Sequence, residues 1–313
     1  MRYNIRDGRA CKRRAQLSNR RFTNMDADFD IVFIGHISKD IIIAPGQHET
    51  GTGGAVWYGA FAALRAGARV AAVIRCAATD FPLLEPLRAA GAAVFPIAAT
   101  ETTSIENRYH DQTRERRTCS SRGFAGQYAV SELPDISARI WHLSGLVRGE
   151  YDLDLMRHLR QRGELSGDAQ GFVRVVRPDK AMEFEDWPEK REALSLFSYF
   201  KTDAAEAEIL TGETDVRAAA AQLAAWGARE VLLTHPGGAL VHAHGEFHNT
   251  PFTARNLSGR TGRGDTTMAA YLTRRLTHTP VQAGRFAAAL VSIKMETPGP
   301  FAGALDDVLS RMD

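Results

Sequence analysis

A glycine-rich turn that carries a single carboxylate is the part of the sequence best suited to chemistry. Within residues 258–267, Gly262 and Gly264 flank Arg263, and Asp265 follows at once. Glycine lets a backbone turn tightly and expose its N–H groups. A helix that begins behind such a turn adds about half a positive charge at the same place. The segment therefore predicts a pocket for an anion with one carboxylate at its edge.

The position of Asp265 beside this pocket suggests a general base. A carboxylate next to an anion site normally repels the ligand. It becomes useful if it removes a proton from a hydroxyl group while the loop amides hold negative charge on a phosphoryl group. The alternative is that Asp265 is a first-turn acid stabilised by the helix dipole, and that both glycines only serve the turn. The spacing alone leaves both interpretations open.

The elements that must position this turn alternate along the chain. Short apolar runs predict strands at residues 31–34, 41–43, 69–74, 93–97, 140–144, 197–201 and 230–234, and a hairpin at 239–248. Longer segments rich in alanine and large apolar residues predict helices at 55–66, 81–90, 153–162, 204–210, 216–226, 266–276 and 283–295. The alternation predicts an α/β fold, a three-layer α/β/α sandwich with a central, mostly parallel sheet.

A polar hairpin is expected to stand off this core. Residues 102–121 alternate roughly with period two, pass through a polar turn and return through charged residues. Such a hairpin is exposed on at least one face and would serve as a small β lid, to which residues 36–50 are also assigned. Residues 26–313 contain no internal repeat and no Pro/Ser-rich linker, which indicates one domain with a lid.

Composition excludes several classes of protein. The chain of 313 residues has a formal net charge of +2 and 44% apolar residues, so it gives no electrostatic case for binding nucleic acid or a membrane. It has no apolar run near the roughly 18 residues that span a bilayer. Three scattered cysteines suit a reducing cytoplasm.

Residues 1–25 differ from the rest of the sequence. They are basic, with Asp7 as the only acid before Met25, and we expect a disordered extension. A basic arm that touches nucleic acid is one alternative. An over-extended reading frame, with Met25 as the true start, is another.

Three segments resemble the ribokinase-like (PfkB) carbohydrate and nucleoside kinases, and they occur in that family's order. Residues 35–54 resemble its first strand, turn and Gly-Gly run, residues 201–212 its Asn-x-x-Glu segment, and residues 261–265 its carboxyl-terminal Gly-Ala-Gly-Asp signature. The resemblance runs from about Asp28 to the C-terminus. It implies an ATP-dependent kinase that phosphorylates a hydroxyl of a sugar or related polyol.

The resemblance also implies a role for each matching residue. Asp265 would be the catalytic base, with Gly262, Arg263 and Gly264 facing the γ-phosphate. The acceptor would be bound by Asp40, Gly53, Gly54, Tyr58 and Asn107. ATP would be bound by Thr234, Gly237, Gly238, Thr261 and Lys294, the last in a helix that borders adenine. Mg²⁺ would be oriented through water by Glu206 and Asp203, as suits a metal that keeps most of its hydration shell.

Four of these positions depart from the family pattern. Gly259 stands where the family has an aspartate that helps to form a monovalent-cation site, which argues against such a site here. Arg263 replaces an alanine and could reach the phosphates or point outward. Tyr58 replaces a sugar-binding asparagine, and Asp203 replaces another asparagine. Without the resemblance, Glu206 would be interpreted as a solvent-facing helix acid, and Asp40 also has the alternative of a turn-capping aspartate.

Other functions stay open. Trp57, Tyr58 and His36 could stack on a ring, which favours a nucleoside or inositol kinase of the same family as the first alternative. The second is a relative that binds ATP and a polyol without catalysis. A dinucleotide-dependent oxidoreductase is disfavoured, because no G-x-G-x-x-G follows the first strand. A homodimer through the lid strands is also expected from the resemblance.

Overall fold

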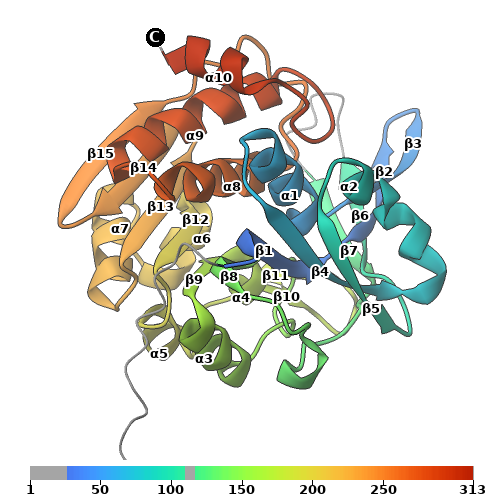
Figure 1. Ribbon diagram of the computed structural model, residues 1–313. Coiled ribbons are helices and arrows are strands. Elements are labelled where there is room, and N and C mark those ends of the chain that lie inside the picture. Colours follow the sequence, from blue (N-terminus) through green and yellow to red (C-terminus); the bar gives the residue numbers. More distant parts are fainter. Residues whose placement is uncertain (1–26, 110–116, 313) are drawn as a thin grey trace, which may run out of the picture.

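A long, twisted sheet forms the middle layer of the protein (Figure 1). The computed structural model describes residues 27–109 and 117–312. The sheet strands are β1 Phe29–His36, β4 Val70–Ala77, β5 Ala93–Ala99, β8 Ala138–Leu143, β9 Glu164–Asp168, β12 Tyr199–Asp203, β13 Glu230–His235, β14 Gly238–Ala243 and β15 Glu246–Pro251. Their order is β15-β14-β13-β12-β9-β8-β1-β4-β5. Pairing is parallel from β13 to β5, and β14 and β15 extend the sheet as an antiparallel hairpin.

The apolar strands are buried on both faces, as parallel strands usually are. In β1, Ile31 and Phe33 belong to the core on one face, while Val32 and Ile34 belong to the core on the other. Successive side chains of a strand point to opposite faces, so a continuous apolar run supplies both cores at once.

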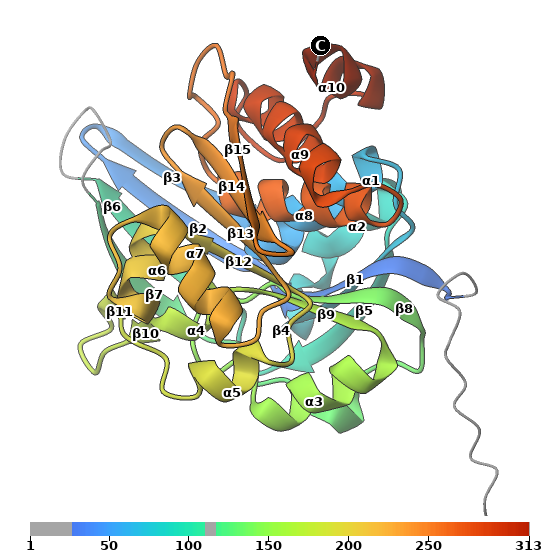
Figure 2. The ribbon, with the colours of Figure 1, turned by 90° about the vertical axis from the view of Figure 1, so that its left-hand side faces the viewer.

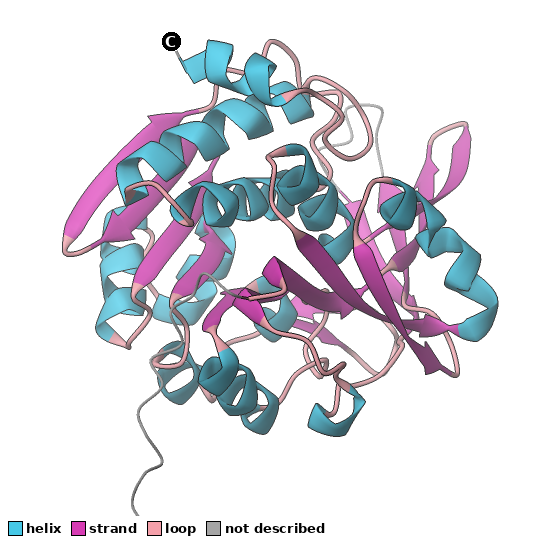
Figure 3. Ribbon diagram, viewed as in Figure 1, coloured by secondary structure: helices cyan, strands magenta, loops and turns pink. Residues whose placement is uncertain are grey.

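Helices cover the two faces of the sheet (Figures 1 and 3). One core contains side chains of α1 Ala55–Arg65, α2 Glu85–Ala89, α8 Arg263–Arg275, α9 Pro280–Met295 and α10 Leu305–Met312. The other contains side chains of α3 Leu153–Arg162, α4 Gln170–Val173, α5 Lys190–Leu194, α6 Ala204–Thr211 and α7 Val216–Ala225. The arrangement confirms the predicted three-layer α/β/α sandwich. Two short 3₁₀ helices, Ala78–Leu84 and Val130–Glu132, lie in the connections.

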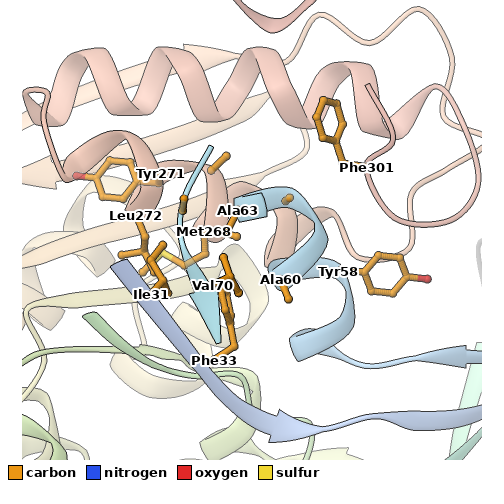
Figure 4. Packing of buried hydrophobic residues seen from close by; sticks show 14 of the residues in the cluster. Ile31, Phe33, Tyr58, Ala60, Ala63, Val70, Met268, Tyr271, Leu272 and Phe301 are labelled. Atoms are coloured by element: carbon orange, nitrogen blue, oxygen red, sulfur yellow. The ribbon is translucent and has the colours of Figure 1, made fainter. Parts of the chain in front are cut away.

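Small residues let α1 and α8 pack closely over the sheet. Ala60 and Ala63 of α1 lie with Met268 of α8 in one cluster with Phe33 and Val70, as Figure 4 shows. At the other end of α1 the ring of Tyr58 points away from this apolar group (Figure 4). The two helices thereby bring a phenol ring and the start of α8 to the same end of the core.

A second, four-stranded sheet forms the lid. Its strands are β2 Ser38–Ala44, β3 Gln47–Gly53, β6 Ser104–Tyr109 and β7 Arg117–Gly123, in the order β3-β2-β6-β7. Figure 2 shows β2, β3 and β6 extending beyond the edge of the central sheet. A short hairpin of β10 Arg174–Val176 and β11 Met182–Phe184 meets β7 through the bridge between Ser120 and Ala181. The separate small β sheet is confirmed; its strands fall within or beside the segments 36–50 and 102–121 expected for it, and the first segment runs on to Gly53.

Several boundaries differ from the sequence-based expectation. Helix α8 begins at Arg263 rather than Thr266, because Gly262 adopts a left-handed conformation (φ 77°) and caps the helix. Expected helix 81–90 is a 3₁₀ turn followed by the short α2, since Pro82 and Pro86 interrupt regular helical hydrogen bonding.

Two further expectations concern the segments outside the described residues and the absence of a membrane-spanning helix. The basic extension 1–25 and the hairpin tip 110–116 lie outside the described residues. Across 27–109 and 117–312, no helix combines the length and the apolarity needed to cross a bilayer.

Candidate active site

A cavity of about 770 Å³ opens where the parallel strands end at their carboxyl sides and the lid begins. In open α/β sheets this edge is where ligands bind. The cavity is lined by Ser38, Asp40, Gly54, Ala55, Tyr58, Ile105, Asn107, Leu146, Gln170, Arg174, Lys201, Asp203, Glu206, Thr234, Leu257, Ser258, Arg260, Thr261, Gly262, Arg263, Gly264 and Asp265. The fold thus gathers segments far apart in the sequence around one polar space.

The start of α8 presents free amides to this cavity. The N–H groups of Gly262, Gly264 and Asp265 have no hydrogen-bond partner within the described part of the chain, and α8 has no side-chain cap. Arg263 N–H donates to the carbonyl of Arg260 (3.2 Å) and so closes the turn. Three unsatisfied donors at a helix N-terminus form a site for an anion.

Asp265 lies on the same turn and lines the same cavity. Burial raises the pKa of Asp265 above its usual range, the positive charge of Lys201 opposes the rise, and the negative charge of Glu206 adds to it. A carboxylate with a raised pKa accepts a proton more readily than an ordinary aspartate. The geometry therefore permits a base at the edge of an anion pocket.

Lys201 is the electrostatic centre of the site, a role that was not assigned to it from the sequence. It is 5% exposed on β12, and its Nζ lies 3.1 Å from both carboxylate oxygens of Asp168 on the neighbouring strand β9. Glu206 Oε2 is 3.6 Å away. Burial would lower the pKa of Lys201, but Asp168 and Glu206 raise it well above its usual value. Gly264 lies against this ammonium, because an added Cβ there would be 2.8 Å from Nζ.

Glu206 and Asp203 form a capping box at the start of α6. Glu206 Oε2 accepts from the Asp203 N–H (2.8 Å), and Asp203 Oδ1 accepts from the Glu206 N–H (2.9 Å). Burial raises the pKa of Glu206 to about 7, with Lys201 opposing the shift. The interpretation of Glu206 as a solvent-facing acid is wrong, since this residue is buried and lines the cavity.

The same pair could orient a hydrated magnesium ion. One oxygen of each residue, Glu206 Oε1 and Asp203 Oδ2, accepts no hydrogen bond from the described residues. Across the whole described part of the chain, no group of three or more His, Cys, Asp or Glu side chains could hold a metal directly. Two free carboxylate oxygens beside a phosphate pocket fit Mg²⁺ that keeps its water shell. The magnesium role of this pair stays a prediction.

The acceptor residues named from the sequence lie at the lid side of the cavity. Asp40, Gly54, Tyr58 and Asn107 line it, and an added Cβ at Gly53 would be 2.4 Å from Asp40 Oδ2. Burial raises the pKa of Tyr58 to about 12, and the charges of Asp40 and Asp265 add to the rise. Both carboxylates therefore act electrostatically on the phenol, and all three groups line the same cavity.

The residues predicted from the sequence to bind the phosphoryl donor divide into two groups. Thr234 and Thr261 line the cavity, but Gly237 and Gly238 do not. Gly238 belongs to the β13–β14 hairpin, where a Cβ would be 2.3 Å from the Thr250 carbonyl oxygen. Lys294 lies behind the anion turn, with its Nζ bonded to backbone carbonyls. Their role in binding a nucleotide stays a prediction.

Some residues of the cavity, and Asp168 beside it, were not anticipated as functional. Lys201 of β12 lines the cavity and pairs in register with Asp168, the last residue of β9, while Gln170 and Arg174 of α4 and β10 line the cavity with an Arg174-to-Gln170 side-chain bond of 3.0 Å. A lysine within the apolar run 197–201 was the available signal, because lysine is almost never buried without a charged partner.

Gly262 has no room for a side chain, which gives the first prediction. Its φ is 77°, and an added Cβ would lie 2.2 Å from Cγ of Tyr58. We expect Gly262→Ala to lower the free energy of unfolding by about 2–3 kcal/mol, through left-handed strain and overpacking. Urea unfolding measures this. Gly299→Ala is the matched control, because Gly299 has φ 91° and nothing within 4 Å of an added Cβ. Equal losses in the two variants would contradict the contact with Tyr58.

Comparison with solved structures defines the class of fold. An Arabidopsis thaliana ribokinase complexed with ribose and ATP matches this chain with a TM-score of 0.72 at 18% identity, over 91% of this chain and 98% of that one. The protein has the α/β ribokinase-like fold, with a central, mostly parallel sheet and a separate small β sheet as lid.

The family follows from the sequence. Residues 24–306 match the model of the pfkB family carbohydrate kinases. The chain belongs to this family, as its motifs predicted.

Two more similar proteins carry descriptions of their ligands. A pyrophosphate-dependent kinase in the ribokinase family, complexed with a pyrophosphate analogue and myo-inositol, is 36% identical, with a TM-score of 0.83 over 90% of this chain and 99% of that one. A cytidine kinase of Thermococcus kodakarensis is 29% identical over 259 residues, which are 78% of this chain and 87% of the relative.

Proposed function

We propose that the protein transfers a phosphoryl group from pyrophosphate to a hydroxyl of a cyclic polyol of the myo-inositol type, with Asp265 as general base. One observation carries the proposal: Asp265 shares a cavity with the unpartnered amides of Gly262 and Gly264. The relative that is 36% identical, with its pyrophosphate analogue and myo-inositol, supports this donor and this acceptor. The acceptor is the inositol alternative raised by the sequence, rather than a simple sugar.

The chemistry is an in-line displacement at the terminal phosphorus. Asp265 takes the proton of the attacking hydroxyl, whose oxygen forms the new P–O bond while inorganic phosphate leaves with the electrons of the broken one. The amides of Gly262 and Gly264 hold charge on the transferred group, and Lys201 adds positive charge beside them. Magnesium, when bound near Glu206 and Asp203, neutralises donor charge. Closure of the lid over Asp40 would exclude water and limit hydrolysis of the donor.

Two arginines favour a donor made only of phosphate. Arg260 and Arg263 line the cavity beside the anion turn, and neither forms a salt bridge with a described residue. Burial lowers the pKa of Arg263, and the charge of Arg260 lowers it further. The charge of Asp203 acts on Arg263 in the opposite sense. Two guanidinium groups that form no salt bridge within the described chain are suited to a polyanion, which Arg binds in bidentate fashion.

The helix expected to border adenine supports the same choice. No described residue of α9 lines the cavity. The segment before the anion turn is instead bonded to that helix end, through Thr253 N–H to Ser292 Oγ (2.9 Å) and Gly259 N–H to the Met295 carbonyl (2.8 Å). The segment and the helix end are therefore in direct contact, and the cavity lining does not extend onto the described residues of α9. ATP, expected from the family resemblance, is therefore the alternative donor.

A matrix of donors and acceptors tests the proposal. Purified protein with Mg²⁺ is given pyrophosphate or ATP, each with myo-inositol, cytidine or ribose, and products are followed by ³¹P NMR. We expect a phosphomonoester and inorganic phosphate from pyrophosphate and myo-inositol. A product formed only from ATP would refute the donor, one formed only with cytidine would refute the acceptor, and a complete lack of products would favour the non-catalytic alternative.

The arginines give a second prediction. We expect Arg263→Met to raise the KM for pyrophosphate about tenfold or more, because a hydrogen bond to a charged group contributes about 1.5–3 kcal/mol. The KM for myo-inositol should change little. Steady-state kinetics measures both. Arg285→Met, which removes an exposed charge from α9, is the control. A donor KM unchanged in Arg263→Met and in the double variant with Arg260→Met would contradict the assignment.

A further inference from the structure

An ammonium group is buried directly behind the anion turn. Lys294 is 2% exposed on α9, and its Nζ donates to the carbonyl oxygen of Gly259 at 2.5 Å and to that of Thr261. The ring centroid of Tyr58 lies 5.1 Å from the same nitrogen. Two carbonyls and one aromatic face thus surround the charge. Burying a lysine costs several kcal/mol unless such partners compensate it, so a purely structural position could be filled more cheaply by an apolar residue.

These contacts fix the direction in which the turn presents its amides. The Thr261–Gly262 peptide is trans, so its C=O and N–H point in opposite directions. Lys294 holds the Thr261 carbonyl on the core side, and the Gly262 N–H, which has no partner among the described residues, therefore points the other way. The same reasoning applies to the Gly259 carbonyl and the N–H of Arg260.

The turn cannot supply this charge itself. An added Cβ at Gly259 would lie 2.0 Å from the carbonyl oxygen of Thr297 and 2.8 Å from that of Lys294. A side chain at this position would therefore collide with the end of α9. The charged group that reaches the two carbonyls comes instead from the helix behind them.

We propose that Lys294 is a positioning residue for phosphoryl transfer, whose ammonium draws the Gly259 and Thr261 carbonyls away from the cavity and keeps the loop amides aimed at the donor phosphate. The inference rests on the proposed function of the turn as donor site. It replaces the assignment of Lys294 to nucleotide contact.

The charge also acts on the base. The titratable groups that face Lys294 are Asp265 of α8 and Tyr58 of α1, while the turn presents only carbonyl oxygens. Lys294 lowers the pKa of Asp265, against the larger effect of burial. Removing its charge should therefore raise the pKa of Asp265, so that the carboxylate form appears only at higher pH.

Two variants separate charge from shape. Lys294→Met keeps the length and removes the charge, while Lys294→Ala leaves a space beside the two carbonyls. We expect kcat to fall about 100-fold in both variants. This is the usual effect of losing one hydrogen-bond donor to the charge that develops in the transition state. Methylammonium should restore Lys294→Ala about tenfold in a saturable way and leave Lys294→Met unchanged. The acid limb of the kcat profile in Lys294→Met should move to higher pH. Arg285→Met, an exposed charge on the same helix, should behave as the wild type.

The outcomes distinguish this inference from the proposed function. Wild-type protein that forms no phosphomonoester refutes the function, and calorimetric binding of pyrophosphate to wild type and Lys294→Met then tests the positioning role alone. We expect at least tenfold weaker binding in the variant. An active wild type with equally active Lys294 variants overturns the inference. Loss of activity that methylammonium does not rescue, with no shift of the acid limb, also overturns the inference. Unfolding of both variants at 25 °C, seen by circular dichroism, overturns it as well. In each case Lys294 would serve only stability.

Discussion

Asp265→Asn should keep the fold and the donor site but lose turnover by about 10²–10⁴-fold, the range for removal of a general base. The amide has the size of the carboxylate and cannot accept the hydroxyl proton. The amides of Gly262 and Gly264 are unchanged, and one negative charge beside the donor is gone. Calorimetry with pyrophosphate should therefore show affinity equal to or higher than that of the wild type, while kcat with myo-inositol falls.

A second first-turn aspartate serves as the control for Asp265. It tests whether turnover depends on a carboxylate in the cavity or only on an acid at a helix N-terminus. Asp306 is an exposed first-turn aspartate of α10, away from the cavity, and Asp306→Asn should leave kcat unchanged. Near-normal turnover in Asp265→Asn would remove the base from the mechanism and leave Asp265 as a dipole-stabilised helix acid.

Lys201→Met should be the most destabilising substitution in the site, by about 3–5 kcal/mol at pH 8. The variant leaves the carboxylates of Asp168 and Glu206 buried without their shared cation, whose Nζ is 3.1 and 3.6 Å from them. Activity should fall as well, because Lys201 opposes the raised pKa of Asp265.

The loss of stability should depend on pH. Burial already raises the pKa of Asp168 and that of Glu206, the latter to about 7, and removal of Lys201 raises both further. At pH 5 the Glu206 carboxyl of the folded variant is largely neutral and carries little penalty, whereas at pH 8 folding must keep the two carboxyls protonated or bury their charges. Urea unfolding of wild type and variant at both pH values measures the difference.

A double variant is the control for this effect. Lys201→Met with Asp168→Asn removes one of the orphaned charges and should recover part of the stability lost at pH 8. A loss below about 1 kcal/mol, or an equal loss at pH 5 and pH 8, would show that the buried cluster does not depend on Lys201.

Much of the fold could be predicted because its signals are local. The apolar run of β1 and the boundaries of α3, Leu153–Arg162, follow from period and capping, and Asp152 caps α3 by accepting from Leu155 N–H (2.8 Å). The order of the family motifs located the anion turn, the acceptor strand β2 and the start of α6. These features depend on residues that are near each other in the chain.

The features that could not be predicted depend on contacts between segments far apart in the sequence. Strand β9 has the sequence Glu-Leu-Ser-Gly-Asp, which lacks a strong strand pattern, yet its register places Asp168 beside Lys201. The contact of Lys294 with the anion turn joins residues 35 and 33 positions apart. The spacing of these residues in the sequence predicts neither contact. Strand β3 is polar and glycine-containing, so only its partner β2 makes it a strand.

A crystal structure with myo-inositol and methylenediphosphonate, a pyrophosphate analogue that cannot be cleaved, tests the central claim most directly. We expect one inositol hydroxyl within about 2.6–3.2 Å of the Asp265 carboxylate. A terminal phosphonate should accept from the N–H groups of Gly262 and Gly264. A polyol seated out of reach of Asp265, or a phosphonate bound away from the turn, would contradict it.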